Sequence, residues 1–525
     1  MYLKLHSCIN KAIKLKLYLC RLFRFKNKIG EIMKSKIISI VAAGCLSALI
    51  TGCTSQPSNE KLLKISQKKI SIVELSSYKT KFFDESAAEI GAYCSLNKSL
   101  YIVNGAKNVI DILDISNPST PKKVGELNAD NFGTGIQSID ISNGIVAVAV
   151  ERKDKNNFNK QNNGVVAFFD ANTNKHIKNI EVGSLPDMVK FTKDGKKLIV
   201  ANEGEPCLHY KCDPEGSISI LDVSEGIDNI RNTKLSFNEF DADRLRAKSV
   251  RIKKGATPSQ DLEPEYITLS EDGNTAWVAL QENNAFAIVD IKNNKLKDIV
   301  GLGYKDHSME GNGFDGSDKD KAINIKTWPV FGMYQPDGIT SCKINGKDYV
   351  LTANEGDGRE YSEDDKDPNY NENANDETKV SKVTLDVKSF PNAKLLQDKK
   401  KGIGRLNIAK DMGDIDGDGD YDQIYSYGAR SFSIFDASGK FVADSGDDFE
   451  TITAKKFPEN FNASNTKNKI DNRSDNKGPE PENVVCYKKD DATYALIGLE
   501  RIGGVMVYNI SNPSKPKFVE YVSNR

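Results

Sequence analysis

The fold is decided by the stretch GSLPDMVKFTKDGKKLIVANEGEPCLHYKCDPEGSISILD, residues 183–222. Residues 189–191 and 198–201 are short β-type runs, and the turn sequence of residues 193–196 joins them as a hairpin. Residues 218–221 alternate as a third strand. This order of strand, turn, strand, loop and strand predicts most of one blade of a β-propeller.

The same order returns along most of the chain in clear, faint and divergent copies. The clear copies are residues 263–291, 335–356 and 480–510, the faint ones are residues 89–115 and 136–151, and the divergent one is residues 405–437. All-strand units that recur every few tens of residues predict a repeat architecture, and units of short strands favour propeller blades. The sequence therefore predicts an all-β fold, a single β-propeller of seven blades.

Long insertions are expected between these units. They are residues 225–261, 301–335, 357–401 and 445–479, and loops of such length are usually functional or disordered. Ahead of the first unit, residues 69–83 form a β-type run that we expect to supply the closing strand of the last blade.

The composition argues for one domain without a strong net field. A chain of 525 residues suggests about three domains from length alone, but a seven-bladed repeat with insertions accommodates residues 66–525 as one. The 73 lysines and arginines nearly balance the 74 aspartates and glutamates. This balance speaks against nucleic acid as a partner and against attraction to an anionic membrane surface.

The start of the chain is typical of a bacterial lipoprotein signal. From Met33 the sequence has a basic beginning, an apolar stretch at residues 37–50 and the ending Ile-Thr-Gly-Cys at Cys53. The alternative, a membrane-spanning helix, needs about 20 apolar residues, more than this stretch offers. The expected segments are an upstream extension from a wrongly assigned start (residues 1–32), the signal peptide (33–52) and a tether (53–65).

Cys53 would carry the lipid, as in the lipoboxes that this ending resembles. The lipid would hold the protein in the cell envelope outside the cytoplasm, in the outer membrane or periplasm or at the cell surface. The alternative is a genuine basic extension that keeps the chain inside the cell, which would make the lipobox a coincidence.

The remaining cysteines predict one disulfide and no haem. Cys207 and Cys212 flank His209, and a local disulfide is favoured over a metal site because two thiols and one imidazole lack a fourth ligand. The chain has no C-x-x-C-H sequence for covalent haem. Buried thiols are expected for three cysteines scattered over different units: Cys94, Cys342 and Cys486.

Several motifs together resemble the choice-of-anchor I family, the bacterial relatives of mesenchyme-specific cell surface glycoproteins. They are LPDMVKFTKDGKKLIVANEGEP, DPEGSISILD, PVFGMYQPD, TANEGDGREY, DIDGDGDYDQIYSYGARSFSIFD, DSGDDFE, DNRSDNKGPEPE and LERIGGVMVYNISNP. The resemblance runs from about residue 70 to the C-terminus. It implies an exported, surface-tethered propeller whose anchor varies between members, and the lipobox would be the anchor here. Some relatives carry an alkaline phosphatase label, but the family name implies no reaction.

Aligning the units reveals two columns of mostly acidic residues. The first, where strand one starts, contains Glu89, Gln137, Asp187, Glu265, Asp337, Arg405 and Glu482; the second, where strand two ends, contains Asn104, Glu151, Glu203, Glu282, Glu355, Arg430 and Glu500. In a propeller both places open onto one face, around the mouth of the central channel. We call these residues the acidic mouth, and ten carboxylates would converge in it.

Two interpretations of the acidic mouth stay open. In one, nearby arginines turn it into a structural ring of salt bridges; they are Arg152, Arg359 and Arg501. In the other, it binds hard cations such as Ca²⁺, and Arg405 and Arg430 grip an anionic group. The ligand residues would be Asp187, Glu203, Glu265, Glu282, Asp337, Glu355, Glu482 and Glu500, with Arg405 and Arg430.

A sharper calcium motif lies in the divergent unit. Asp414, Asp416, Asp418 and Asp422 occupy positions 1, 3, 5 and 9 of a calcium loop with glycine at position 6, while Tyr425 replaces the glutamate of an EF-hand at position 12. The spacing resembles the calcium hairpins of integrin-type propellers. We expect Ca²⁺ here, in the first hairpin of its unit and on the face opposite the acidic mouth; the alternative is a metal-free turn.

Enzyme signatures are few. The sequence has no G-x-S-x-G, P-loop or H-E-x-x-H motif, so no nucleotide cofactor is expected, and a lone loop histidine such as His307 is usually structural. The favoured function is a lipid-anchored, calcium-dependent binding or scaffold protein for an envelope ligand that is anionic or metal-bridged. The alternative is a metal-dependent phosphoesterase resembling alkaline phosphatase or phytase. Residues 315–320 and 444–450 are weaker acidic clusters, which turn chemistry explains nearly as well as cation binding does.

Overall fold

The computed structural model describes residues 70–82, 85–153, 161–362, 370–371 and 374–523. The predicted all-β fold is confirmed: within these residues the strands form seven sheets, six of four strands and one of five. The expected signal peptide, Cys53 and most of the N-terminal region lie outside the described residues. None of the helices described is long and apolar enough to cross a membrane.

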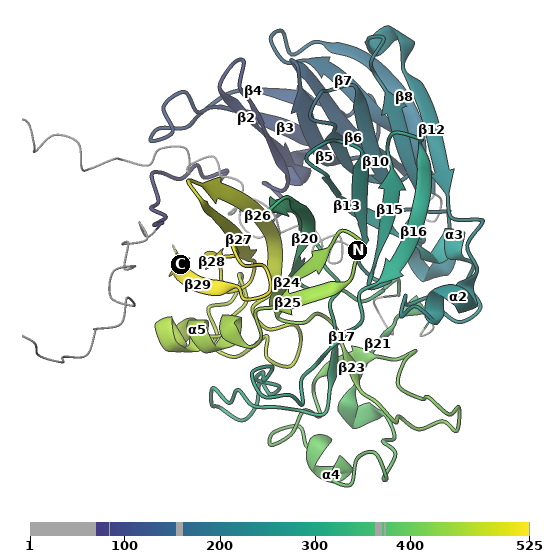
Figure 1. Ribbon diagram of the computed structural model, residues 1–525, viewed down its shortest axis with the longest axis vertical. Coiled ribbons are helices and arrows are strands. Elements are labelled where there is room, and N and C mark those ends of the chain that lie inside the picture. The colour runs from purple at the N-terminus through teal and green to yellow at the C-terminus, as the bar shows by residue number, and fades with distance from the viewer. Residues whose placement is uncertain (1–69, 83–84, 154–160, 363–369, 372–373, 524–525) are drawn as a thin grey trace, which may run out of the picture.

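The four-stranded sheets are antiparallel and follow one another along the chain, as the change of colour in Figure 1 shows. The first two are β1 (Gly91–Cys94), β2 (Ser99–Asn104), β3 (Val109–Asp114) and β4 (Lys122–Asn128), then β5 (Gly135–Ser142), β6 (Ile145–Lys153), β7 (Gln161–Asp170) and β8 (His176–Ser184). The next two are β9 (Pro186–Phe191), β10 (Lys197–Asn202), β11 (Ser217–Asp222) and β12 (Arg231–Ser236), then β13 (Pro264–Leu269), β14 (Thr275–Leu280), β15 (Ala285–Asp290) and β16 (Lys295–Gly301). The last two are β19 (Ile339–Ile344), β20 (Lys347–Asn354), β24 (Ser431–Asp436) and β25 (Phe441–Asp444), then β26 (Pro481–Lys489), β27 (Ala492–Leu499), β28 (Val505–Asn509) and β29 (Lys517–Val522).

The stretch that decides the fold forms the sheet β9–β12. Val189 of β9 pairs with Val200 of β10 across the predicted hairpin. In the turn, the hydroxyl of Thr192 donates to the carboxylate of Asp194 at 2.7 Å, and Gly195 adopts a φ of +69°, which glycine reaches without steric cost. Side-chain and backbone chemistry therefore reverse the chain at the place that the sequence predicts.

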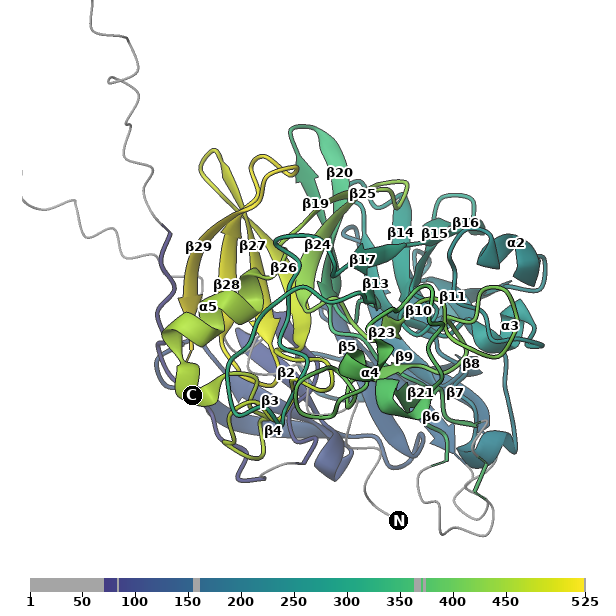
Figure 2. The same cartoon turned by 90° about the horizontal axis from the view of Figure 1, so that it is seen from below.

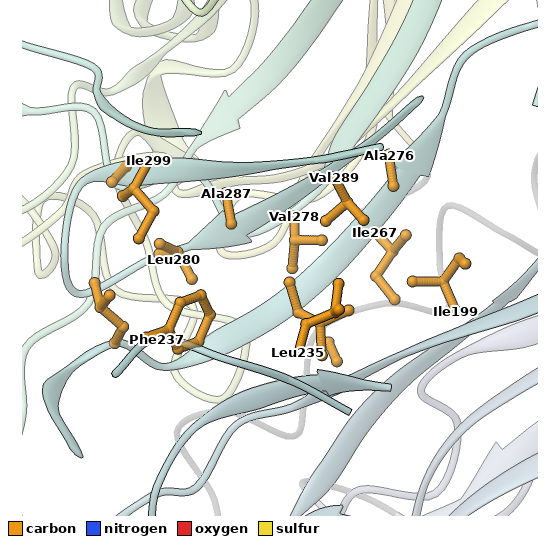
Figure 3. Packing of buried hydrophobic residues seen from close by; sticks show 14 of the residues in the cluster. Ile199, Leu235, Phe237, Ile267, Ala276, Val278, Leu280, Ala287, Val289 and Ile299 are labelled. Carbon is orange, nitrogen blue, oxygen red and sulfur yellow. The ribbon is translucent and has the colours of Figure 1, made fainter. Parts of the chain in front are cut away.

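Neighbouring sheets pack against one another, largely through their first strands. β1 contacts β5, β5 contacts β9, β9 contacts β13, β13 contacts β19 and β19 contacts β26. Figure 3 shows the core between two of them, where Ile199 of β10 lies near Ile267 and Val278 from β13 and β14. Each such side chain contributes about 1.5–3 kcal/mol when it is fully buried, so sheet-on-sheet packing holds the array together.

The divergent copy at residues 405–437 does not form a sheet of its own, so the prediction that it is a separate blade was wrong. β24 pairs with β20, as in Asn354 opposite Ser431, and so completes the sheet that the copy at residues 335–356 begins. Its other strands lie in the five-stranded sheet, whose order is β17 (Tyr304–Asp306), β18 (Phe331–Met333), β23 (Tyr425–Ser426), β22 (Asn407–Ala409) and β21 (Glu377–Lys379). Residues 355–430 therefore form an insertion inside one sheet, between its second and third strands.

The insertions build a small structure of their own around the five-stranded sheet. Its core includes Phe314, Trp328, Ile403 and Leu406. Figure 1 shows α4, β21 and β23 below the four-stranded sheets, and Figure 2, seen from below, shows them in front of strands of these sheets. The helices are α2 (Ala242–Arg246), α3 (Pro258–Asp261), α4 (Ala393–Leu396) and α5 (Asp448–Lys456), with short 3-10 turns η2 (Gly105–Lys107), η3 (Leu208–Tyr210), η4 (Ile227–Asn229), η6 (Val380–Lys382) and η7 (Pro458–Asn460).

The segment of residues 70–82 forms no strand, so the expected closing strand is a second correction. Ile70 and Ile72 are nevertheless buried against the last sheet, and the N–H of Ile72 donates to Glu520 at 3.2 Å. Further along, Tyr78 packs on the first sheet. The last sheet already has four strands from residues 481–522, so the segment runs as a strap from the last sheet to the first.

The structure confirms one cysteine prediction and corrects another. Cys207 and Cys212 form the expected local disulfide. Cys342 and Cys486, expected as free thiols, form a second disulfide with Cα atoms 5.7 Å apart. They lie on β19 and β26, the first strands of adjacent sheets. Because 144 positions separate them in the sequence, the sequence alone did not indicate that they are close. Cys94 is a buried free thiol.

Candidate functional site

The two predicted columns lie at the same end of the sheets. An antiparallel strand begins where its partner ends, and Asp187 near the start of β9 is thus beside Glu203 just after β10. The backbone fixes this arrangement, because the N–H of Glu203 donates to the carbonyl of Leu185 at 2.8 Å. In the last sheet, the N–H of Glu500 donates to the carbonyl of Glu480 at 2.8 Å. Sheet register therefore brings the columns together.

Four members of the acidic mouth form a cluster that we call the bare cluster: Asp187, Glu203, Glu265 and Glu282. Glu265 and Glu282 share a hydrogen bond. Glu282 is only 9 % exposed, and its Oε2 has no hydrogen-bond partner in the described part of the chain. Within the described ranges, no ion pair joins any of the four to a lysine or arginine.

The carboxyls of the bare cluster act on one another. Burial, followed by the charges of Asp337 and Glu282, raises the pKa of Asp187 to about 7. Burial raises the pKa of Glu203 well above its ordinary value, and Glu205 and Asp187 add to this effect. The pKa of Glu265 is raised in the same way by burial and by Glu282. Crowded carboxylates without a counter-charge are stabilised by a bound cation.

The other half of the acidic mouth has its own basic groups. Lys477 Nζ lies 2.9 Å from Glu355 and 3.8 Å from Glu480. Arg501 lies 2.8 Å from Glu480 and 3.0 Å from Glu500. Burial alone would lower the pKa of Arg501, but these two carboxylates raise it above its ordinary value. This half is a buried network of ion pairs, as the structural interpretation expects.

Carboxylate oxygens nevertheless come closest together in this second half. Asp337, Glu355 and Glu482 each offer an oxygen within 4.8 Å of the others, and so do Glu355, Glu480 and Glu500. Distances alone would allow either group to hold a metal ion. Glu355 belongs to both groups and is the residue that Lys477 contacts most closely.

A third group of charges joins the insertion of residues 225–261 to that of residues 357–401 through ion pairs. Arg359 is buried, 3.0 Å from Glu263 and 3.8 Å from Asp376. Arg251 belongs to the same group and lies 2.8 Å from Asp376 and 2.6 Å from Asp411. Arg359 was expected beside the column of glutamates, and its partners come from outside the columns.

Sequence reasoning missed Glu263, Glu480 and Lys477. Both glutamates stand two residues before a column acid, in the tripeptides Glu263-Pro264-Glu265 and Glu480-Pro481-Glu482. The repeated Glu-Pro-Glu could have marked them. Lys477 had no such signal, because it lies in an insertion that has no counterpart in the other sheets.

The contacts of Arg405 and Arg430 lie away from the carboxylates of the two columns. Arg430 is buried and donates to Glu450 at 2.6 Å, and its remaining N–H groups donate to backbone carbonyls, including that of Ser474 at 2.8 Å. Arg405 pairs with Asp318 at 2.6 Å and Asp475 at 2.8 Å. These partners occupy both guanidinium groups, so the expectation that they grip an anion in the mouth finds no support in their contacts.

The calcium motif lies elsewhere than expected. Asp414, Asp416 and Asp422 place oxygens within 4.8 Å of one another, as a cation site requires, but Asp418 is not part of this group. The N–H groups of Gly417 and Gly419 donate to Asp414, which a metal-free turn also allows. The loop connects β22 and β23 of the five-stranded sheet, so its expected position in the first hairpin of a blade was wrong.

His307 and the weaker acidic clusters have structural surroundings. Burial, followed by the charge of Lys305, lowers the pKa of His307 well below its ordinary value, and its Nδ1 is bonded to the carbonyl of Asn312. Asp315 accepts backbone N–H bonds from Ser317 and Asn324. These two contacts of Asp315 are typical of a turn.

A cavity of about 510 Å³ lies at the opposite end of the strands from the mouth, between the first hairpins of two sheets. Lys193, Lys197, Asp272 and Lys292 are among its lining residues. Its charges have mixed signs, and Lys197 is already bonded to the carbonyl of Ile291. This cavity is separate from the carboxylates described above.

A family model and a known protein match parts of the chain. A family model described as choice-of-anchor I domain matches residues 89–513. Gigasin-3a of Magallana gigas is 31 % identical over 116 residues, which are 21 % of this chain and 40 % of that protein, so the chain spans less than half of this relative.

Two solved structures share a distant likeness with the chain. One is hydrazine synthase of Kuenenia stuttgartiensis, with 13 % identity, a TM-score of 0.28 and coverage of 51 % of this chain and 80 % of that one. Another is a functionally unknown protein of Desulfotomaculum acetoxidans, with 13 % identity, a TM-score of 0.30 and coverage of 68 % and 84 %.

Proposed function

The chain belongs to the choice-of-anchor I domain family, a group of proteins associated with the cell surface or envelope, and we propose that it is a lipid-anchored binding protein that uses calcium at its acidic mouth. The lipid would be attached at Cys53. The ligand would be an anionic or metal-bridged molecule of the envelope, held through the bound cation.

The fold proposed with this function is one β-propeller. The succession of antiparallel four-stranded sheets, packed through their first strands, supports it. In such a fold the first strands surround a central channel, and residues at their starts line its mouth. A site at the mouth would then receive carboxylates from several sheets at once.

The observation that carries the proposal is the convergence of carboxylates from separate sheets. Asp187 comes from β9, Glu265 from β13 and Glu282 from just after β14, and the charge of Glu282 acts on both Asp187 and Glu265. Carboxylate oxygens are the ligands that Ca²⁺ prefers. Because a calcium ion takes six to eight oxygens, an ion held by a few side chains keeps positions for phosphate or carboxylate groups of a ligand.

The contacts of Arg405 and Arg430 do not favour the phosphoesterase alternative. It required arginines of the mouth to hold a phosphate group, and Arg405 and Arg430 have their partners elsewhere. We therefore favour binding over hydrolysis. The same contacts mean that the anionic end of the ligand would contact the cation rather than a guanidinium.

Calorimetric titration of the full chain in detergent tests the function. Asp414→Asn combined with Asp416→Asn removes two carboxylates of the calcium motif, and we call this protein the loop-deficient variant. It should still bind Ca²⁺, with a dissociation constant in the range of about 0.1–1 mM that is usual for extracellular calcium modules. If the unaltered chain binds calcium and the loop-deficient variant does not, the acidic mouth is not a calcium site.

A further inference from the structure

We propose that the acidic mouth holds its divalent cation at the bare cluster of Asp187, Glu203, Glu265 and Glu282, and that the ammonium group of Lys477 takes the place of a metal ion in the other half. This inference rests on the proposed function and adds a location to it. It also assigns a different role to the carboxylates that lie closest together.

The bare cluster has acidic groups and no basic ones. Its four carboxylates come from two adjacent sheets, and in the described residues none of them has an ion pair with a lysine or arginine. Glu282 provides a second observation. Its side chain is 9 % exposed, yet Oε2 accepts no hydrogen bond from any described residue, and burial of an unpaired carboxylate oxygen is costly.

A cation would remove this cost directly. Glu265 also has an oxygen, Oε1, without a described hydrogen-bond partner, so the two neighbouring glutamates together present unused acceptors. Each could serve as a ligand without breaking an existing bond of that oxygen. Asp187 and Glu203 then add negative charge around the ion.

The half around Glu355 differs because it contains basic groups that form ion pairs with its carboxylates. Among the described residues, Lys477, Arg473 and Arg501 face four carboxylates there, those of Glu355, Asp357, Glu480 and Glu500. Lys477 Nζ is within 4 Å of three of them. A lysine ammonium is a compact point charge, and here it sits against the residue shared by both sets of close carboxylates.

A metal ion at Glu355 would therefore meet a buried positive charge at close range. Like charges in a poorly solvated place repel strongly, and Lys477 has only 5 % of its side chain exposed. To admit a metal ion, the lysine would have to leave and lose its three ion pairs. The short oxygen distances around Glu355 thus reflect a lysine site, and the metal belongs to the bare cluster.

The test compares single changes in the loop-deficient variant by calcium titration. Glu282→Gln should weaken binding at least tenfold, because it removes a ligand without changing the side-chain shape. Glu355→Gln should change the affinity less than threefold and should lower the melting temperature, because it leaves Lys477 with fewer partners. Larger loss of affinity from Glu355→Gln than from Glu282→Gln would overturn the inference.

A second variant keeps the test informative if Glu355→Gln fails to fold. Lys477→Gln removes the ammonium and should raise the number of bound calcium ions from one to two, with a larger calcium-dependent rise in melting temperature. An unchanged number of ions would contradict the role of Lys477. Absence of binding in the loop-deficient variant itself would instead overturn the proposed function and the inference with it, so the two failures are distinguishable.

Discussion

Asp471 shows at the level of one residue how burial without a counter-charge affects stability. It is 6 % exposed, and one of its carboxylate oxygens has no described hydrogen-bond partner. Burial, partly offset by a bond from Ser474 and assisted by the charges of Asp315 and Asp320, raises the pKa of Asp471 to about 8. The folded protein therefore prefers this group protonated.

This preference gives a sign to the pH dependence. Between about pH 4, the ordinary value for aspartate, and pH 8, the folded state holds a proton that the unfolded state has lost. The free energy of unfolding therefore falls as the pH rises through this window. Asp471→Asn should remove that fall and make the protein more stable than the unaltered chain by up to about 5 kcal/mol at pH 8, measured by urea unfolding, with little difference at pH 4.

Asp386 is the matched control for this prediction. N–H groups of Ser389 and Lys388 lower the pKa of Asp386, so its contribution is present above pH 4 and is lost as the pH falls. Asp386→Asn should thus be less stable than the unaltered chain at neutral pH and equal to it in acid. If Asp471→Asn followed the pattern of Asp386→Asn, burial would not dominate at Asp471.

Residue-scale reasoning from the sequence found the acids of the mouth and one of their counter-ions, Arg501, which pairs with Glu500, but not the others. Glu203 and Glu282 could be placed because each follows a strand at the same position of a similar unit. Lys477 and Arg473 come from an insertion that is unique to one place in the chain. Their contacts depend on how distant segments pack, which an alignment of units does not contain.

At the scale of the element, the hairpins explain why the sheets were predictable. Thr192 donates to Asp194 in one hairpin, and Ser270 donates to Asp272 at 2.6 Å in the next sheet. Such turns are local, so they can be recognised from a few residues. The sheet of β19, β20, β24 and β25 could not be recognised in this way, because residues 355–430 separate its second and third strands. The expectation of seven blades counted that sheet twice.

The calcium motif is an element with its own test. Asp416→Ala combined with Asp418→Ala should remove the part of the calcium-dependent rise in melting temperature that the motif contributes, because a ligand that binds only the folded state stabilises it by mass action, about 2.7 kcal/mol at a hundredfold excess over the dissociation constant. Differential scanning calorimetry with calcium and with chelator measures the effect. The gain should be read against Glu282→Gln, which leaves the loop intact.

Asp272→Ala is a suitable control for the motif. Asp272 also accepts N–H bonds in a turn, but it is a single carboxylate rather than a group of three. This variant should keep the calcium-dependent gain of the unaltered chain. Identical melting of the unaltered chain with calcium and with chelator would rule out a stabilising ion at the motif.

At the scale of the whole molecule, we expect Cys53 to determine where the protein resides. Cells supplied with radiolabelled palmitate should label the unaltered chain and not Cys53→Ala, and the variant should leave the membrane fraction. The physical reason is that acyl chains supply the apolar area for membrane attachment, about 0.8 kcal/mol for each buried CH₂ group.

Cys94→Ala is the control for the lipid experiment. Cys94 is a buried thiol on β1, so its removal should leave the label in place. Label that survives in Cys53→Ala would show that the lipid, if present, is attached elsewhere.

If the protein is anchored at Cys53, as we propose, the strap of residues 70–82 has a mechanical consequence. A pull on the tether reaches Ile70 and Ile72 before it reaches any strand, because these side chains are the first described contacts with the last sheet. Their described contacts are apolar contacts and a hydrogen bond from the N–H of Ile72 to the carboxylate of Glu520, and these can break one after another by local opening. Under a pulling force the strap would detach first and could bind again afterwards. The hydrogen bonds between the strands of the sheets would not bear the force while the strap is detaching.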